Sequence, residues 1–535
     1  MSFKNKYIFI ITIILSLNSN AQQQLIHIDS YSIEKTESEI NKNNLQIHTS
    51  FKPLIKSQFI DKTNIDSVLF EYGRDSLFLS KRKHPVWWQK LRTEDLLIVD
   101  KGDFKLRINP LFNFSMGKNT INDTSLSINS RGIIIEGDIT DKFSFVSEFH
   151  ENQAFFPDYF RDYSKAHRVV PGQGRLRNFE EWGFDYANAS GSVSFTPIKQ
   201  LNFTLGHGKH FIGDGYRSLL LSDNSFYYPY FKITTTLKKF QYTYMLTSFQ
   251  AASTADTRTL VYQRKHGSFL FLNYLLTKRI QIGLFEGVMF QTSDSVSNNN
   301  FTANYFNPFI LTRSLGYRLS DNNNVLLGFT AKIDFPKGIQ TYGQYMLDDD
   351  VAKKSGWQIG VKAFNLFGLK NLYFQTEYNR VRPYSYAHSN INQSWTYYNQ
   401  PIASPLGAGF EETIIILKYR FKDFIIRLKN NYVVTSEDYY IGSATGNNAP
   451  NTNVGVNVFQ SDDNATYNPL SSSEIGGDNK ITIRNINIGL SYLVNPVTNF
   501  QVFVEYQNRN HTTYGETNFY YFGIRTNLNN VYFDF

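Results

Sequence analysis

The chain has 535 residues and no cysteine, which excludes disulfides, thiolate metal sites and a catalytic thiol. Its formal net charge of +8 is modest for this length and argues against a dedicated nucleic-acid-binding protein. Hydrophobic residues make up 41% of the chain and aromatic residues 16%, with 46 Phe and 35 Tyr. An aromatic-rich, moderately polar chain suits strands that alternate between two different solvents.

The N-terminus, MSFKNKYIFIITIILSLNSNAQQQ, has a basic start, an apolar run from Tyr7 to Leu17 and a small residue at Ala21. This pattern predicts a signal peptide over residues 1–21. The apolar run is too short to span a bilayer comfortably. Residues 22–100 are polar and lack period-2 alternation, and SIEKTESEINKNN is compatible with a short helix. We expect residues 22–100 to form a partly helical periplasmic region that packs under or against the following domain.

Alternating apolar and polar residues recur from about residue 103 to the end of the chain. In DFIIRLKNNY, Phe424, Ile426 and Leu428 share one face, and Arg427 and Lys429 lie on the other. A period of two predicts strands, and segments of about ten residues match tilted membrane strands. The predicted fold is therefore all-β: a transmembrane antiparallel barrel over residues 101–535.

The connections between these strands are short and long in turn, as in outer-membrane barrels. Short connections such as 197–200 and 422–423 are expected in the periplasm, and long ones such as 211–227 and 383–410 outside. This alternation gives about 18 strands, the first at 103–115 and the last at 517–528. A terminal strand closing on Phe535 resembles the C-terminal signal that outer-membrane assembly machinery reads.

Basic residues dominate the predicted lumenal face, which would attract anions because a low-dielectric wall focuses the electric field. An equally weighted alternative is that these charges only solvate or cross-link the wall. The predicted lumenal cations are Lys105, Arg107, Lys332, Lys362, Lys418, Arg420, Arg427, Lys429, Arg509 and Arg525, and the acids are Asp334, Glu377 and Glu505.

The stretch GHGKHFIGDGYRSLLLSDNS, residues 206–225, concentrates glycines, charges and a short apolar run. Its glycines allow positive φ and close backbone approach, which predicts an external segment that folds back toward the lumen. Arg217 is expected to pair with Asp214 or Asp223 inside this segment. The predicted structural motif comprises Gly206, Gly208, Gly213, Asp214, Gly215, Tyr216, Ser222 and Asp223.

Three catalytic or cofactor alternatives fit this stretch less well. On a strand, His207 and His210 would face opposite sides, so they make a poor metal chelate. Ser218 or Ser222 with His207 and Asp214 suggests a hydrolase, yet no GxSxG elbow exists. The spacing of a phosphate-binding loop is absent as well. We therefore predict no enzyme, no cofactor and no metal.

The core GDGYRSLLLSDNS, with VVPGQGRLRNFEEWGFDYANASG upstream and YFNPFILTRSLGYRLSDNNNVLLGF downstream, resembles the Wzi-like capsule-assembly outer-membrane family in its Bacteroidota form. It is also similar to gliding-motility-associated outer-membrane proteins of that phylum. The resemblance covers roughly residues 95–535. It implies an eighteen-strand barrel with a helical periplasmic portion that holds capsular polysaccharide at the cell surface.

The predicted function is a non-enzymatic outer-membrane barrel of a Gram-negative bacterium that binds or organises surface polysaccharide of the capsular, anionic kind. The alternatives are an accessory protein of gliding motility or surface secretion, and a passive anion-preferring porin. The expected partners are outer-membrane lipids, surface polysaccharide and, through Phe535, the assembly machinery, with no nucleic acid. The candidate ligand-binding residues are Lys209, His210, Arg217, Arg175, Arg177, Arg427, Lys429 and Trp395.

Overall fold

The structure is a computed structural model of the full chain. It describes residues 25–59, 62–71, 85–252, 262–291, 306–312, 323–348, 354–436, 454–462, 475, 480–528 and 530–535. The predicted signal peptide, residues 1–21, lies outside the described residues.

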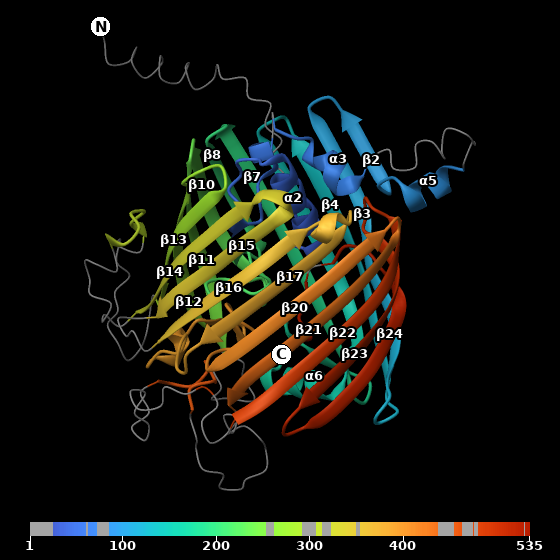
Figure 1. Ribbon diagram of the computed structural model, residues 1–535, viewed down its shortest axis with the longest axis vertical. Coiled ribbons are helices and arrows are strands. Elements are labelled where there is room, and N and C mark those ends of the chain that lie inside the picture. The colour runs from blue at the N-terminus through green and yellow to red at the C-terminus, as the bar shows by residue number, and fades with distance from the viewer. Residues whose placement is uncertain are drawn as a thin grey trace.

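The described residues form a closed antiparallel barrel (Figure 1). Its ring contains twenty strands, of which β2 (Leu97–Lys101) and β6 (Arg177–Phe179) are short additions to β3 and β7; the other eighteen build the wall. The predicted strand number is therefore confirmed. The wall strands are β3 (Phe104–Asn119), β4 (Ser125–Ile139), β5 (Phe143–Phe155), β7 (Gly183–Ile198), β8 (Leu201–Gly208), β10 (Tyr228–Leu237), β11 (Phe240–Ala252), β12 (Tyr262–Leu275), β13 (Ile280–Phe290), β14 (Asn324–Phe335), β15 (Ile339–Asp348), β16 (Ser355–Phe364), β17 (Leu372–Val381), β20 (Phe410–Phe421), β21 (Phe424–Ser436), β22 (Lys480–Asn495), β23 (Phe500–His511) and β24 (Gly515–Arg525).

The two faces of the wall follow the predicted alternation. On β21, Phe424, Ile426 and Leu428 are 50%, 51% and 39% exposed on the outside, whereas Ile425 and Lys429 are buried inside. Large apolar side chains on the outer surface are stable where the surrounding solvent is lipid. Each strand therefore contributes one face to a lipid-facing surface and the other to a crowded lumen.

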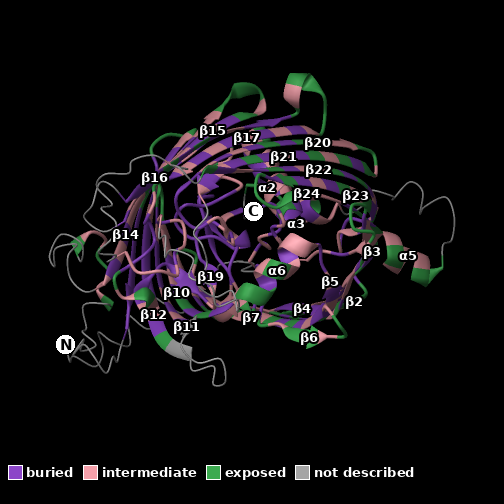
Figure 2. Ribbon diagram, turned by 90° about the horizontal axis from the view of Figure 1, so that it is seen from below, coloured by how far each residue is buried: buried purple, intermediate pink, exposed green. Residues whose placement is uncertain are grey.

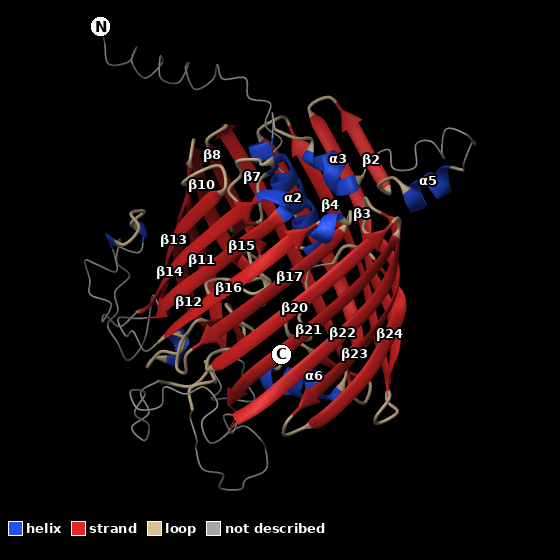
Figure 3. Ribbon diagram, viewed as in Figure 1, coloured by secondary structure: helices blue, strands red, loops and turns tan. Residues whose placement is uncertain are grey.

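The two ends of the barrel differ. Helices α2 (Ser30–Asn43) and α3 (Ile65–Phe70) lie at the end with the short turns, and α6 (Asp158–His167) lies at the end with the long connections (Figure 3). Helix α5 (Val86–Arg92) lies beside the wall near the short-turn end. None of the helices in the described ranges is long and apolar enough to cross a membrane.

The N-terminal segment enters the lumen, where α2 lies inside the ring of strands (Figure 2). The sequence predicts this helix. Asp29 caps its start by accepting a hydrogen bond from the Ser32 amide at 2.9 Å, and Asn44 ends it in the left-handed conformation. After the helix, β1 (Phe51–Lys52) pairs with β9 (Phe211–Ile212) in a small antiparallel sheet. A hairpin of β18 (Thr396–Tyr397) and β19 (Gln400–Pro401) forms a further sheet.

The C-terminal tail corrects one prediction, because the last strand ends at Arg525 and not at Phe535. Residues 526–528 and 530–535 fold back into the barrel, where Phe535 is 9% exposed and packs against Phe160 of α6 with ring centroids 5.8 Å apart. The Arg509 guanidinium donates to the Phe535 carbonyl oxygen at 3.2 Å. Aromatic packing and this cation draw the tail inward, so that both ends of the described chain contribute to the lumen.

Candidate functional site: the plugged lumen and its cavity

Residues 209–227 fold into the barrel, as the sequence predicts. Leu219, Leu220 and Leu221 are all completely buried, which confirms the expected apolar plug. Gly213 has φ of +125°, and a Cβ there would overlap the amide of Gln344. At Gly215 a Cβ would lie 2.6 Å from Glu377 Oε2. These two positions need glycine because the segment presses directly against the inner wall.

This inward segment meets the N-terminal segment at Asp214. Thr49 and Ser50 each donate a hydroxyl to the Asp214 carboxylate, at 2.7 and 2.6 Å. Burial alone would raise the pKa of Asp214, but Lys332, Lys52 and these hydroxyls outweigh it and lower the pKa to about 2. Asp214 is therefore a buried anion that joins the two segments.

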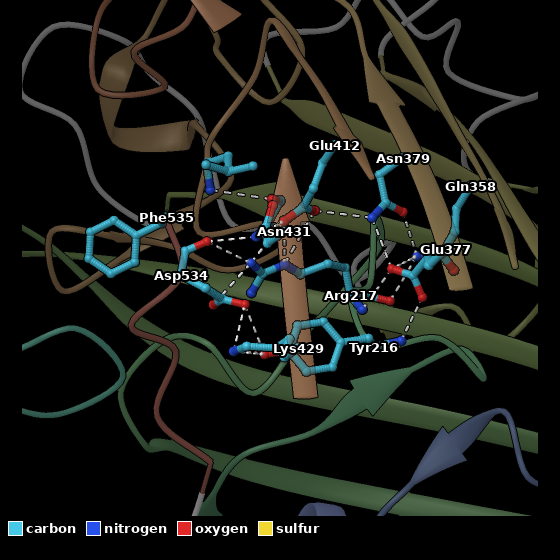
Figure 4. Close-up of polar contacts among 12 residues, drawn as sticks. Tyr216, Arg217, Gln358, Glu377, Asn379, Glu412, Lys429, Asn431, Asp534 and Phe535 are labelled. Carbon is cyan, nitrogen blue, oxygen red and sulfur yellow. Dashed lines mark hydrogen bonds and ion pairs between the residues drawn. The ribbon is translucent and has the colours of Figure 1, made fainter. Parts of the chain in front are cut away.

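Arg217 fixes the same segment to the far side of the wall (Figure 4). Its guanidinium is 2% exposed and donates to Glu412 Oε1 through Nη2 at 2.9 Å and through Nε at 3.1 Å. Asp534 of the C-terminal tail lies 3.1 Å from the same Nη2 and 3.0 Å from Lys429 Nζ. Burial would raise the pKa of Asp534, yet the adjacent Arg217 and Lys429 hold it well below its usual range.

The predicted pairing of Arg217 with Asp214 or Asp223 is wrong, because Arg217 turns away from both toward Glu412 and Asp534. Asp223 accepts hydrogen bonds from Tyr532 and Asn530 of the tail, at 2.8 and 3.0 Å. The sequence analysis missed Glu412 and Asp534. The alternation along the predicted strand 411–421 places Glu412 on the lumenal face, and this position was the signal that could have identified it.

A second long connection, residues 382–409, also packs inside the barrel. Trp395 is 1% exposed and donates its indole N–H to the Leu220 carbonyl oxygen at 2.8 Å. Its ring makes edge-to-face contacts with Phe269 at 5.5 Å and Phe285 at 6.4 Å. These contacts bury the Trp395 ring in the plug, where it packs against other side chains of the protein.

Acidic residues of the N-terminal segment neutralise much of the basic wall. Glu37 Oε2 lies 2.5 Å from Lys362 Nζ, and Glu34 Oε2 lies 2.9 Å from Lys418 Nζ. Glu71 accepts two hydrogen bonds from the Arg420 guanidinium, one of them at 2.8 Å. The predicted lumenal cations are present, but these three act as cross-links, which is the alternative that the sequence left open.

A cavity of about 390 Å³ remains in the lumen between α2, the inward segment, the C-terminal tail and the wall from β16 through β24 to β7. The predicted ligand residues Arg427 and Lys429 line it. Lys429 contacts Asp534, whereas Arg427 has no carboxylate within ion-pair distance among the residues that the structure describes. The cavity falls within the range of about 300–1,000 Å³ that is typical of small-molecule sites.

The other predicted ligand residues lie in different places. Lys209 is buried and donates to the Gly172 carbonyl oxygen at 2.6 Å; burial lowers its pKa to about 8, although Asp223 opposes the shift. His210 is completely buried, and its pKa lies well below 6.5 because of burial and the nearby Lys232. Arg175 and Arg177 are exposed, in the connection between β5 and β7 that also contains α6. The structure thus separates the predicted set into the plug, the cavity and the outer surface.

The residues of the rival chemistries do not meet. His207 contacts the Ala189 carbonyl oxygen on the opposite side of the strand from His210, as expected from the alternation. Ser218 and Ser222 donate their hydroxyls to the Ile212 and Ala403 carbonyl oxygens, both at 2.5 Å. Within the described ranges, no three His, Asp or Glu side chains are grouped as a metal site would require.

No family model matches this chain, and no curated protein matches it. Among solved structures it resembles Wzi of Escherichia coli, an outer membrane protein involved in group 1 capsule assembly and a carbohydrate-binding β-barrel; the TM-score is 0.53 and the identity 13%, over 95% of this chain and 100% of Wzi. Acinetobacter baumannii OccAB2 gives a TM-score of 0.43 and 9% identity over 79% of this chain and 97% of its own. Pseudomonas aeruginosa OprD gives 0.41 and 12% over 81% and 98%. The likeness to Wzi shows that this chain has the fold of an outer-membrane β-barrel.

Proposed function

We propose that this protein resides in the outer membrane and binds or organises surface polysaccharide there, without catalysing a reaction. The observation that carries the proposal is the filled lumen. Segments from both ends of the chain and two inward connections occupy it and are held by buried ion pairs at Lys362, Arg217 and Lys429. A barrel filled in this way suits holding a ligand better than conducting solutes. The fold likeness to Wzi, itself a carbohydrate-binding barrel, supports the same reading.

The connection between β5 and β7 offers exposed cations to an acidic polymer. Arg175 and Arg177 are exposed there, whereas the neighbouring Arg161 is paired with Asp158 at 2.9 Å. Exposed cations attract an acidic polymer over a distance of about 10 Å at moderate salt. We propose this surface as the first contact for an anionic polysaccharide.

Retention of polysaccharide on cells tests the proposal. A strain that lacks the gene should release its surface polysaccharide into the medium, and restoring the intact gene should reverse the loss. The double variant Arg175→Gln/Arg177→Gln should retain less polymer than the wild type, with a loss that shrinks at high salt. Lys238→Gln/Lys370→Gln is the matched control, because these exposed lysines lie on turns at the opposite end. Unchanged retention in the deletion strain would reject the proposed function.

A further inference from the structure

The wall of the lumenal cavity contains one row of side chains that lies across four neighbouring strands. Arg427 of β21 is opposite Gly489 of β22, Gly489 is opposite Glu505 of β23, and Glu505 is opposite Tyr521 of β24. Paired residues of antiparallel strands point to the same face, so all four positions face the cavity. Gly489 contributes no side chain between Arg427 and Glu505, whose backbones are about 10 Å apart, and the Glu505 side chain lies over it, with Cγ 3.2 Å from where a Cβ would stand.

Most basic side chains that line the cavity are paired with a carboxylate, whereas Arg427 interacts with Glu505 only beyond ion-pair distance. Lys362, Lys418 and Lys429 each have a carboxylate partner in the N-terminal segment or the tail. Glu505 is taken by Arg525, whose Nη2 lies 2.7 Å from Glu505 Oε1. In the described part of the chain, Arg427 is thus the cavity-lining cation that lacks such a partner.

Polar atoms without partners line the same cavity. The Ser115 hydroxyl, the Tyr521 hydroxyl and the Asn113 carbonyl oxygen have no hydrogen-bond partner within the described structure. Ser115 is 5% exposed and Tyr521 is 7% exposed, so both would incur a desolvation cost if left unpaired. Ser115 pairs with Gly523 two residues from Tyr521, which places the two hydroxyls on adjacent strands.

We infer that this cavity binds a single carboxylate-bearing sugar residue, with Arg427 as the counter-ion of the carboxylate. The inference rests on the proposed function and narrows it to a ligand class and a position. One guanidinium forms a bidentate contact with one carboxylate, and Arg427 is the cavity-lining arginine, among the described residues, that has no carboxylate at that distance. Ser115, Tyr521 and Asn113 then supply the donors and acceptors that the sugar hydroxyls need.

Calorimetric titration of the detergent-solubilised full chain tests the inference, with D-glucuronate as the probe and D-glucose as its uncharged match. The wild type should bind glucuronate more tightly than glucose. Arg427→Gln should weaken glucuronate binding by about 10- to 100-fold, the loss expected for a charge-assisted hydrogen bond. Arg427→Lys should recover part of the affinity, and Tyr521→Phe should weaken binding by about 2- to 10-fold. Arg484→Gln, on the outer face of β22, is the matched control and should bind as the wild type does.

Equal affinity of Arg427→Gln and the wild type, equal affinity for the two sugars, or no binding of glucuronate would each overturn the inference. Retention of polysaccharide on cells, measured in parallel, separates this inference from the proposed function. If cells retain polymer in a gene-dependent way while the purified protein ignores glucuronate, the cavity assignment fails and the proposed function stands. If both measurements fail, both proposals fall.

Discussion

Replacing Asp534 with Asn should loosen the inward segment from the wall. Asp534 is 1% exposed and forms ion pairs with Arg217 at 3.1 Å and Lys429 at 3.0 Å. It also accepts a hydrogen bond from the Tyr216 hydroxyl at 3.0 Å. The variant keeps the side-chain shape but leaves Lys429 without a carboxylate, while Arg217 retains Glu412. Breaking a buried ion pair costs about 3–5 kcal/mol, and because Arg217 keeps one partner we expect about 3–4 kcal/mol here.

Hydrogen exchange of the full chain in lipid vesicles measures this loss. A local free-energy loss of about 3–4 kcal/mol corresponds to about a 100- to 1,000-fold decrease in protection of the amides in residues 209–227. The amides of β12 provide an internal reference. Asp123→Asn is the matched control, since Asp123 forms an exposed pair with Lys118 and should leave that protection unchanged. A decrease of less than about fivefold for Asp534→Asn would refute the proposed anchoring role.

Three further predictions follow from the plug. In planar bilayers the full chain should pass little current. Deletion of residues 25–59 should raise the conductance and make the current favour anions, because Lys362 loses its carboxylate partner. An unchanged or cation-selective current in the deletion variant would contradict this prediction. Acidification should release the N-terminal segment. The pKa of Asp214 is lowered from 3.8 to about 2, and that of Glu71 from 4.5 to about 2. The stabilisation that these carboxylates provide is therefore complete above pH 4.5 and is lost as pH falls toward 2, and protease cleavage of that segment would reveal the loss. Trp395→Ala should lower the free energy of unfolding by about 3–5 kcal/mol and shift the denaturation midpoint, with Trp395→Phe milder, whereas a loss below about 1 kcal/mol would show that its packing is unimportant.

The wall of the barrel was predictable from the sequence because its information is local. A strand that faces lipid on one side and the lumen on the other alternates between outward-facing apolar and inward-facing side chains, as residues 424–429 do. This pattern is visible in a few consecutive residues. The inward fold of residues 211–227 was also predictable, because glycines at 213 and 215 indicate close approach to another surface.

The contents of the lumen were not predictable in the same way, because their partners are remote in sequence. Glu37 lies 325 residues from Lys362, and Arg217 lies 195 residues from Glu412. Closure of the ring brings these residues together, and no short motif records which acid will face which cation. From the sequence, the acidic residues of the N-terminal segment were therefore not expected to line the lumen, and the lumen was expected to be more basic than it is.

The tail and the N-terminal segment touch each other inside the barrel, and this contact constrains the order of assembly. Asn530 donates to the Ile28 carbonyl oxygen at 2.8 Å, Asn527 donates to Asp29 at 3.1 Å, and β24 closes the ring on β3. None of these contacts can form before residues 519–530 have been synthesised and have reached the membrane. A chain that lacks residues 526–535 would therefore lose the Asn527 and Asn530 contacts, whereas β24 could still close the ring on β3.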